Sequence, residues 1–238
     1  MGRMISRLLM WDVDGTLVRA GDLGALVFDV ALEAVLGFRP AARVRMSGKT
    51  DPMIVMEYLE QSDLEADDET VRKVLEGIEE HLAAAAAAGD LAAGGHACPG
   101  VVDVLAELSR DDRVLSTLVT GNIVANARLK VAAWGLDPWF DMDVGAYGSD
   151  HADRNQLVPL ALGRVRDSYG AELTPHDTWV IGDTPRDLEC ARAAGARCLL
   201  VGTGRYTATE LAALGADAVL DDLADTARVV EILTGDLN

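Results

Sequence analysis

The sequence predicts an α/β fold, with a Rossmann-like parallel sheet core flanked by helices and an inserted all-helical cap domain. After residue 95, short apolar and β-branched runs alternate with amphipathic helical stretches, an alternation that implies right-handed crossovers between parallel strands. The segment between Arg19 and His96 instead shows helical periodicity without a convincing strand. We therefore expect a core made of residues 1–19 and 97–238, and a cap made of residues 20–96.

The core elements are expected in regular order along the chain. A first strand at residues 8–11 precedes the insertion and should join the sheet of the later strands. Those strands are expected at 114–119, 178–181, 198–201 and 218–220. Helices are expected at 99–109, 122–134, 156–169, 185–194 and 208–214, followed by a C-terminal helix.

Apolar periodicity in the insertion predicts three helices, at residues 23–36, 53–59 and 70–88. Asp51 followed by Pro52 is typical of a helix N-cap and first helical position. The alanine run that ends the third stretch extends a helix, because alanine is the best helix former. The glycine-containing stretch 89–95 then predicts a hinge back into the core.

Composition narrows the class of partner. A formal net charge of −18 argues against nucleic acid and against an anionic membrane surface. No apolar stretch is long enough to span a bilayer, because Asp12 interrupts the first candidate. The three cysteines show no CxxC spacing, which favours small buried thiols in a reducing compartment. We expect a cytoplasmic protein that is a monomer or a homodimer.

The motif Asp12-Val13-Asp14-Gly15-Thr16 directly follows the first expected strand. Aspartate is disfavoured in strands, and a buried charge is costly unless it is paired or bound to metal. The alternative is a strand that ends in an ordinary Asp-Gly turn, since Gly15 supplies backbone freedom. Taken alone, this motif leaves both interpretations open.

A second motif, Thr120-Gly121-Asn122, lies at the end of the strand expected at 114–119. Open parallel sheets bind ligands at this edge. A hydroxyl, a glycine and amides at a helix N-terminus are typical of an anion-binding site. The alternative is that Asn122 is only a helix N-cap.

A third motif, Gly182-Asp183-Thr184-Pro185-Arg186-Asp187, follows the strand expected at 178–181. Asp187 falls in the first turn of a helix, where a negative charge complements the helix dipole. Capping does not explain Asp183. Carboxylates at such a position suit Mg²⁺, which rarely needs a full protein cage.

The polar loop at residues 148–155 precedes a helix, and Arg154 is its fixed cation. A solvent-exposed arginine is the alternative to a functional one.

The order of these motifs resembles the haloacid dehalogenase-like (HAD) hydrolase superfamily, phosphatase branch with a small helical cap, and the phosphoglycolate phosphatases in particular. The resemblance covers essentially the whole chain. Between the second and third of these motifs that family usually has a lysine, and the matching position here is Arg154, which keeps the charge that neutralises phosphate. Lys130 is the alternative, but its place inside the helix after Asn122 predicts a surface residue.

The resemblance implies a Mg²⁺-dependent phosphomonoesterase that hydrolyses a small phosphorylated metabolite through an aspartyl-phosphate. It implies that Asp12 is the nucleophile and that Asp14 is the general acid and then the general base. Because dehalogenases of the family lack this second aspartate, Asp14 points to phosphate esters.

Metal and phosphate ligands also follow from the resemblance. Mg²⁺ would be held by Asp12, the Asp14 backbone carbonyl and Asp183, with Asp187 as a ligand or as support. The residues expected to hold the phosphoryl oxygens are Thr120, Gly121, Asn122 and Arg154.

A short basic stretch lies in the expected cap, with cations at Arg39, Arg43, Arg45 and Lys49. We hypothesise that Arg45 or Lys49 binds the leaving group of a small anionic substrate, for which phosphoglycolate is the first candidate; a solvated loop is the alternative. The glycine-rich stretch 201–205 lacks the lysine of a P-loop and is expected to be a turn at a strand end.

Two other functions remain open from the sequence. A phosphosugar mutase of the β-phosphoglucomutase type would use the same aspartyl-phosphate. A non-catalytic binding protein that retains the HAD fold is disfavoured by the presence of all four aspartates.

Overall fold

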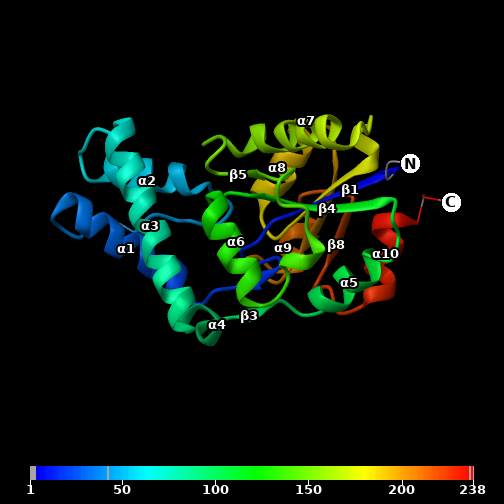
Figure 1. Ribbon diagram of the computed structural model, residues 1–238, viewed down its shortest axis with the longest axis horizontal. Coiled ribbons are helices and arrows are strands. Elements are labelled where there is room, and N and C mark those ends of the chain that lie inside the picture. The colour runs from blue at the N-terminus through cyan, green and yellow to red at the C-terminus, as the bar shows by residue number, and fades with distance from the viewer. Residues whose placement is uncertain (1–3, 42, 236, 238) are drawn as a thin grey trace.

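A six-stranded parallel sheet forms the centre of the molecule (Figure 1). The computed structural model describes residues 4–41, 43–235 and 237; residues 1–3, 42, 236 and 238, which fall in the expected core and cap ranges, lie outside the described residues. In spatial order the strands are β5 (Ala146–Tyr147), β4 (Val114–Thr120), β1 (Arg7–Trp11), β6 (Thr178–Gly182), β7 (Arg197–Val201) and β8 (Ala218–Leu220). Every pairing is parallel, which confirms the expected fold class.

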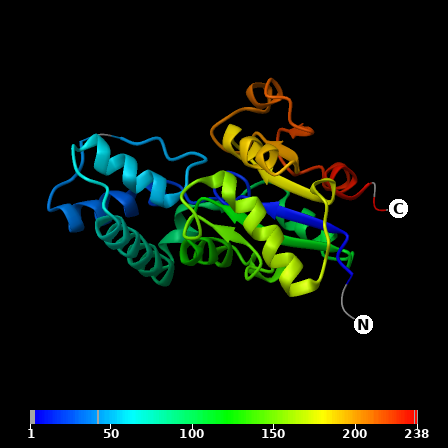
Figure 2. The same ribbon diagram turned by 90° about the horizontal axis from the view of Figure 1, so that it is seen from above.

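Helices cover both faces of this sheet (Figure 2). One face packs against α5 (Val101–Leu108), α6 (Val124–Ala133) and α10 (Thr226–Thr234), and the other against α7 (Leu157–Tyr169), α8 (Pro185–Ala193) and α9 (Ala208–Ala212). Strand β1 shows the alternation that this layering requires, because Leu9 and Trp11 join one core while Leu8 and Met10 join the other. The central strand therefore ends between two apolar layers.

In the described part of the chain, four helices lie between two short strands, β2 (Val18–Arg19) and β3 (His96–Ala97), which pair antiparallel. These cap helices are α1 (Leu23–Leu36), α2 (Asp51–Gln61), α3 (Asp68–Ala88) and α4 (Asp90–Gly94). They enclose a separate apolar core, against which Leu129, Ala133 and Trp134 also pack from α6 and the residue after it. Figure 1 shows the cap helices to one side of the sheet.

Two local expectations about the cap differ from the structure. The N-cap of α2 is Thr50, whose hydroxyl accepts the Met53 N–H at 3.3 Å, so Asp51 is the first helical residue and its carboxylate is free for other contacts. Residues 90–94, expected in a hinge, form the short helix α4 because Gly89 ends α3 at φ +84° and Leu91 is buried in the cap core.

The three cysteines are buried free thiols, as expected. Across the described residues, the helices all fall short of the length or the apolar character that crossing a membrane requires.

Candidate active site

The carboxyl ends of three adjacent strands bring the sequence motifs together. Asp12 follows β1, Thr120 ends β4, and Asp183 follows β6. Because β1 lies between β4 and β6, these side chains meet at one edge of the sheet. A cavity of about 570 Å³ opens there, and its wall also includes the cap residues Phe28 and Ile54.

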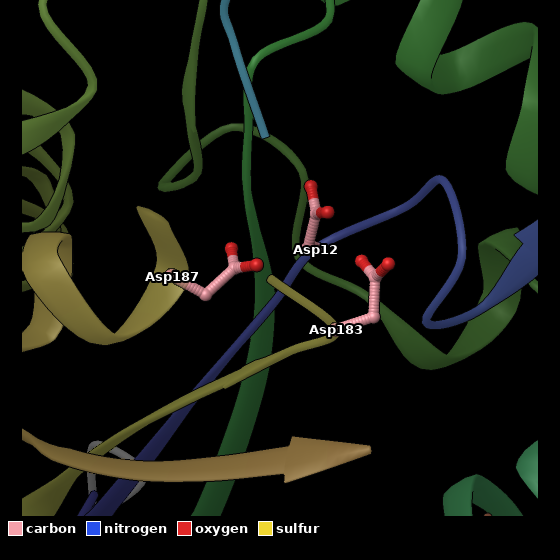
Figure 3. A group of neighbouring side chains, drawn as sticks. All are labelled: Asp12, Asp183 and Asp187. Carbon is pink, nitrogen blue, oxygen red and sulfur yellow. The ribbon is translucent and has the colours of Figure 1, made fainter. Parts of the chain in front are cut away.

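Three buried carboxylates form a cluster in this region. Oxygen atoms of Asp12, Asp183 and Asp187 lie within 4.8 Å of one another (Figure 3). Asp187 is fixed by the start of α8, where its Oδ2 accepts the Thr184 N–H at 3.0 Å and the Thr184 hydroxyl at 2.7 Å. Its other oxygen is therefore oriented toward the cluster, where it forms an ion pair with Arg154.

Arg154 is buried within the site rather than solvent exposed. Its Nη2 lies 3.1 Å from Asp12 Oδ1 and also forms the ion pair with Asp187. Its Nη1 donates to the Gly48 carbonyl at 3.3 Å, which ties a cap segment to the core. The arginine thus provides one positive charge beside the first and third motifs.

The charge of the cluster fits a divalent cation. Among the described residues, Arg154 is the cation that pairs within this cluster, with Asp12 and Asp187, so the three carboxylates carry an excess of two negative charges. Burial raises the pKa of Asp12 to about 6, with Asp187 and Asp14 adding to the shift and Arg154 opposing it. Burial and the charges of Asp187 and Asp12 also raise the pKa of Asp183 well above its ordinary value. A bound Mg²⁺ would remove this repulsion, and oxygen ligands are the ones it prefers.

A glycine-rich loop closes against the cluster. A Cβ at Gly204 would lie 1.6 Å from Asp183 Oδ2, so the loop approaches the carboxylate as closely as only glycine allows. The Thr203 hydroxyl donates to the Gly15 carbonyl at 2.6 Å. The stretch 201–205 is therefore a turn at the end of β7, as expected, and it also forms part of the cavity wall.

Lys130 is buried, and the expectation that it lies on the surface is wrong. Its Nζ lies 2.5 Å from Asp14 Oδ2 and 2.7 Å from Asn122 Oδ1, while Asn122 Nδ2 donates to Asp14 Oδ2 at 2.7 Å. Helical spacing explains the burial, because Asn126 and Lys130 lie four residues apart on the inward face of α6. Ile123 is buried on the same side, but Asn126 and Lys130 are polar, so the apolar pattern of the sequence does not mark this face as buried.

The expected basic stretch of the cap divides into different environments. Arg39 and Arg43 both pair with Asp29, each at 2.6 Å. Lys49 lines the cavity and forms an ion pair with Glu57. Arg45 is exposed and is not among the residues that line the cavity, so its place at the leaving group stays a prediction.

Asp51 is a site residue that the sequence suggested only as a helix cap. Its Oδ2 accepts the Ile123 N–H at 2.8 Å, and its own N–H donates to the Gly121 carbonyl at 2.7 Å. Burial raises its pKa to about 6, against the opposing charge of Lys130. A Cβ at Gly121 would lie 2.1 Å from the Lys49 carbonyl, so the second motif and the start of α2 are in close contact.

Comparison with known proteins agrees with this geometry. Residues 155–226 match the family model described as HAD-hydrolase-like. The chain is 30% identical over 233 residues to phosphoglycolate phosphatase 1 of Pseudomonas aeruginosa, a match that covers 93% of this chain and 78% of that protein. It is 29% identical over 225 residues to the phosphoglycolate phosphatase of Rhodospirillum rubrum, with 92% and 88% covered.

Solved structures share the fold. The crystal structure of CbbY from Rhodobacter sphaeroides in complex with phosphate superposes with a TM-score of 0.69 at 22% identity, covering 93% of this chain and 96% of that one. A hydrolase from Pseudomonas syringae gives a TM-score of 0.70 at 20% identity, covering 95% and 98%. The chain belongs to the haloacid dehalogenase-like hydrolase superfamily, as an enzyme of its phosphatase branch with a small helical cap.

Proposed function

We propose that this phosphatase is a Mg²⁺-dependent phosphomonoesterase that acts on a small phosphorylated metabolite through an aspartyl-phosphate at Asp12. One observation carries the proposal: the Asp12 carboxylate lies at the end of the central strand, beside Arg154 and two further carboxylates, in the wall of a cavity. A cavity of about 570 Å³ is within the range of small-ligand sites.

In the first step, a carboxylate oxygen of Asp12 attacks phosphorus, and the bond from phosphorus to the leaving oxygen breaks. Asp14 donates a proton to that oxygen and then accepts one from the water that attacks the phosphoryl group, which releases Asp12. Mg²⁺ held by Asp12, Asp183 and the Asp14 backbone carbonyl, with Asp187 as a ligand or as support, would offset the repulsion between anionic nucleophile and anionic ester.

Two hydrogen-bond donors support Asp14 in this role. Lys130 and Asn122 both contact its Oδ2, which fixes the side chain. The side chain is still 46% exposed in the cavity wall, so Oδ1 remains available for proton transfer. We assign Lys130 as the residue that positions the general acid and base.

The phosphoryl oxygens would be held by Arg154, the Thr120 hydroxyl and the backbone amides of Gly121 and Asn122. Thr120 and Asn122 are both buried, and the Thr120 hydroxyl hydrogen-bonds the Asp12 carboxylate. Fixed donors at this point stabilise developing charge without reorganisation.

We also propose that the chain divides into a core (1–19 and 97–238) and a cap (20–96), and that the cap covers the cavity.

We infer phosphoglycolate as the first substrate to test, because both curated relatives described above carry that name. Buried free thiols and the high negative charge support a cytoplasmic protein, and we propose a monomer or a homodimer.

The test is phosphate release from a panel of phosphate esters, with Mg²⁺ and with EDTA, for the wild type and Asp12→Asn. We expect turnover that requires Mg²⁺ and disappears in Asp12→Asn, whereas Asp167→Asn, at an exposed position on α7, retains it. Release that persists in Asp12→Asn would refute the proposal. Absence of release together with isomerisation of a sugar phosphate would favour the mutase instead.

A further inference from the structure

Five cations of the described residues line the active-site cavity, and they differ in whether a carboxylate already pairs with them. They are Arg19, Lys49, Lys130, Arg154 and Arg205. Lys49 pairs with Glu57, Lys130 with Asp14, and Arg154 with Asp12 and Asp187. Within the part of the chain that the structure describes, Arg19 and Arg205 are the two that lack an ion-pair partner.

The two arginines come from segments that meet. Arg19 lies in β2, where the chain passes from the core to the cap, and its Nη1 donates to the Thr203 carbonyl at 3.3 Å. Arg205 follows two residues later in the same loop. That loop is held against the site by the Thr203 hydroxyl and by the close approach of Gly204 to Asp183.

We propose that Arg19 and Arg205 form a second anion subsite, which binds a carboxylate or phosphate on the leaving group of the substrate. This inference rests on the proposed function, since it assumes that Asp12 and Arg154 hold the phosphoryl group that is transferred. A chain with a net charge of −18 repels anions, so two unpaired cations in its catalytic cavity create local attraction. The planar guanidinium group suits both carboxylate and phosphate.

The cations that already pair with carboxylates do not supply a free partner for a second anion of the substrate. Arg154 and Lys130 are already engaged with carboxylates of the catalytic machinery, and Lys49 is neutralised within the cap. A second anion on the substrate would therefore find its free partners at the Arg19 and Arg205 side of the cavity. The substrate class is a small monoester with one further anionic group.

The experiment compares matched esters on the wild type and on the double variant Arg19→Gln/Arg205→Gln. The esters are 2-phosphoglycolate, 1,3-propanediol bisphosphate and 2-hydroxyethyl phosphate, of which only the last lacks a second anion. We expect the wild type to prefer at least one of the first two. The double variant should lose about 10-fold to 100-fold in kcat/KM for that ester, and less than about threefold for 2-hydroxyethyl phosphate. The preferred ester identifies the second anion as carboxylate or as phosphate.

The control is Arg166→Gln, which removes an exposed arginine on α7, outside the cavity, and should change neither ratio. Equal losses for all three esters, or an unchanged preference in the double variant, would overturn the proposal.

A binding measurement separates this inference from the proposed function. Calorimetry with Asp12→Asn and Mg²⁺ should show tighter binding of the preferred ester, which carries the second anionic group, than of 2-hydroxyethyl phosphate, and this difference should vanish when the two arginines are also replaced. The result does not depend on turnover. If the wild type hydrolyses none of the esters while this binding pattern is present, the phosphatase mechanism is refuted and the subsite is supported. Equal binding of both esters would refute the subsite.

Discussion

Replacing Lys130 with methionine tests how Asp14 is positioned. The change keeps most of the buried volume and removes the ammonium group that lies 2.5 Å from Asp14 Oδ2. A hydrogen bond to a charged group contributes about 1.5–3 kcal/mol. Because the Asp14 side chain is 46% exposed and water can replace part of the contact, we take the lower end, about 1.5 kcal/mol. This corresponds to a roughly tenfold loss of rate.

The assay is the dependence of kcat/KM on the leaving group. Alkyl phosphates need a proton on the departing oxygen, so Lys130→Met should lower their kcat/KM about tenfold. The p-nitrophenolate of p-nitrophenyl phosphate leaves without that proton, so kcat/KM for this ester should change by less than about twofold. The matched control is Arg128→Met on the same helix, whose side chain is half exposed and pairs with the exposed Asp143. An equal loss for both ester classes would refute the positioning role, because it would mean that Lys130 acts on phosphate binding or on folding.

Three further predictions concern metal, glycine and pH. Mg²⁺ should stabilise the wild type by relieving the repulsion within the carboxylate cluster. At a Mg²⁺ concentration of 100 times Kd the free energy of unfolding should rise by about 2.7 kcal/mol, which is seen as a higher Tm, and Asp183→Asn should abolish this gain. Gly204→Ala should weaken Mg²⁺ binding about 10-fold to 100-fold by calorimetry, since its Cβ would displace Asp183, whereas Gly163→Ala, with open space around it, should not; equal effects would contradict the contact. Burial raises the pKa of Asp51 from 3.8 to about 6. The contribution of Asp51 to stability is therefore greatest at a pH below its pKa in the unfolded chain, and it is lost as the pH rises through about 6. Urea unfolding should therefore show the wild type gaining up to about 3 kcal/mol relative to Asp51→Asn between pH 7 and pH 4, and a parallel pH dependence would contradict the shift.

The main elements could be predicted because their signals are local. Strands β1, β4, β6 and β7 are short apolar runs that end at polar motifs, and the rule that parallel sheets bind ligands at their carboxyl ends placed those motifs together. Strand β5 has only two residues and β2 pairs over two, so neither carries a periodicity that a sequence reveals.

The parts of the site that were missed depend on tertiary contacts. Lys130 lies within a helix, and its burial follows from which face of α6 meets the cavity. Asp51 looks like a helix cap until the chain folds and the Ile123 amide reaches it. Arg19 and Arg205 are separated by most of the core and cap sequence, and only the contact between β2 and the loop after β7 brings them to one cavity.

The most direct test of the account is the identity of the residue that carries the phosphoryl group. Asp14→Asn should slow hydrolysis of the intermediate, because that step needs the general base, while p-nitrophenyl phosphate still forms it without a general acid. Asp14→Asn is mixed with p-nitrophenyl phosphate and Mg²⁺ and quenched rapidly in acid. Mass spectrometry of its peptides should then find one phosphoryl group on Asp12. Consumption of the ester without a covalent adduct, or with the adduct on another residue, would contradict the central claim.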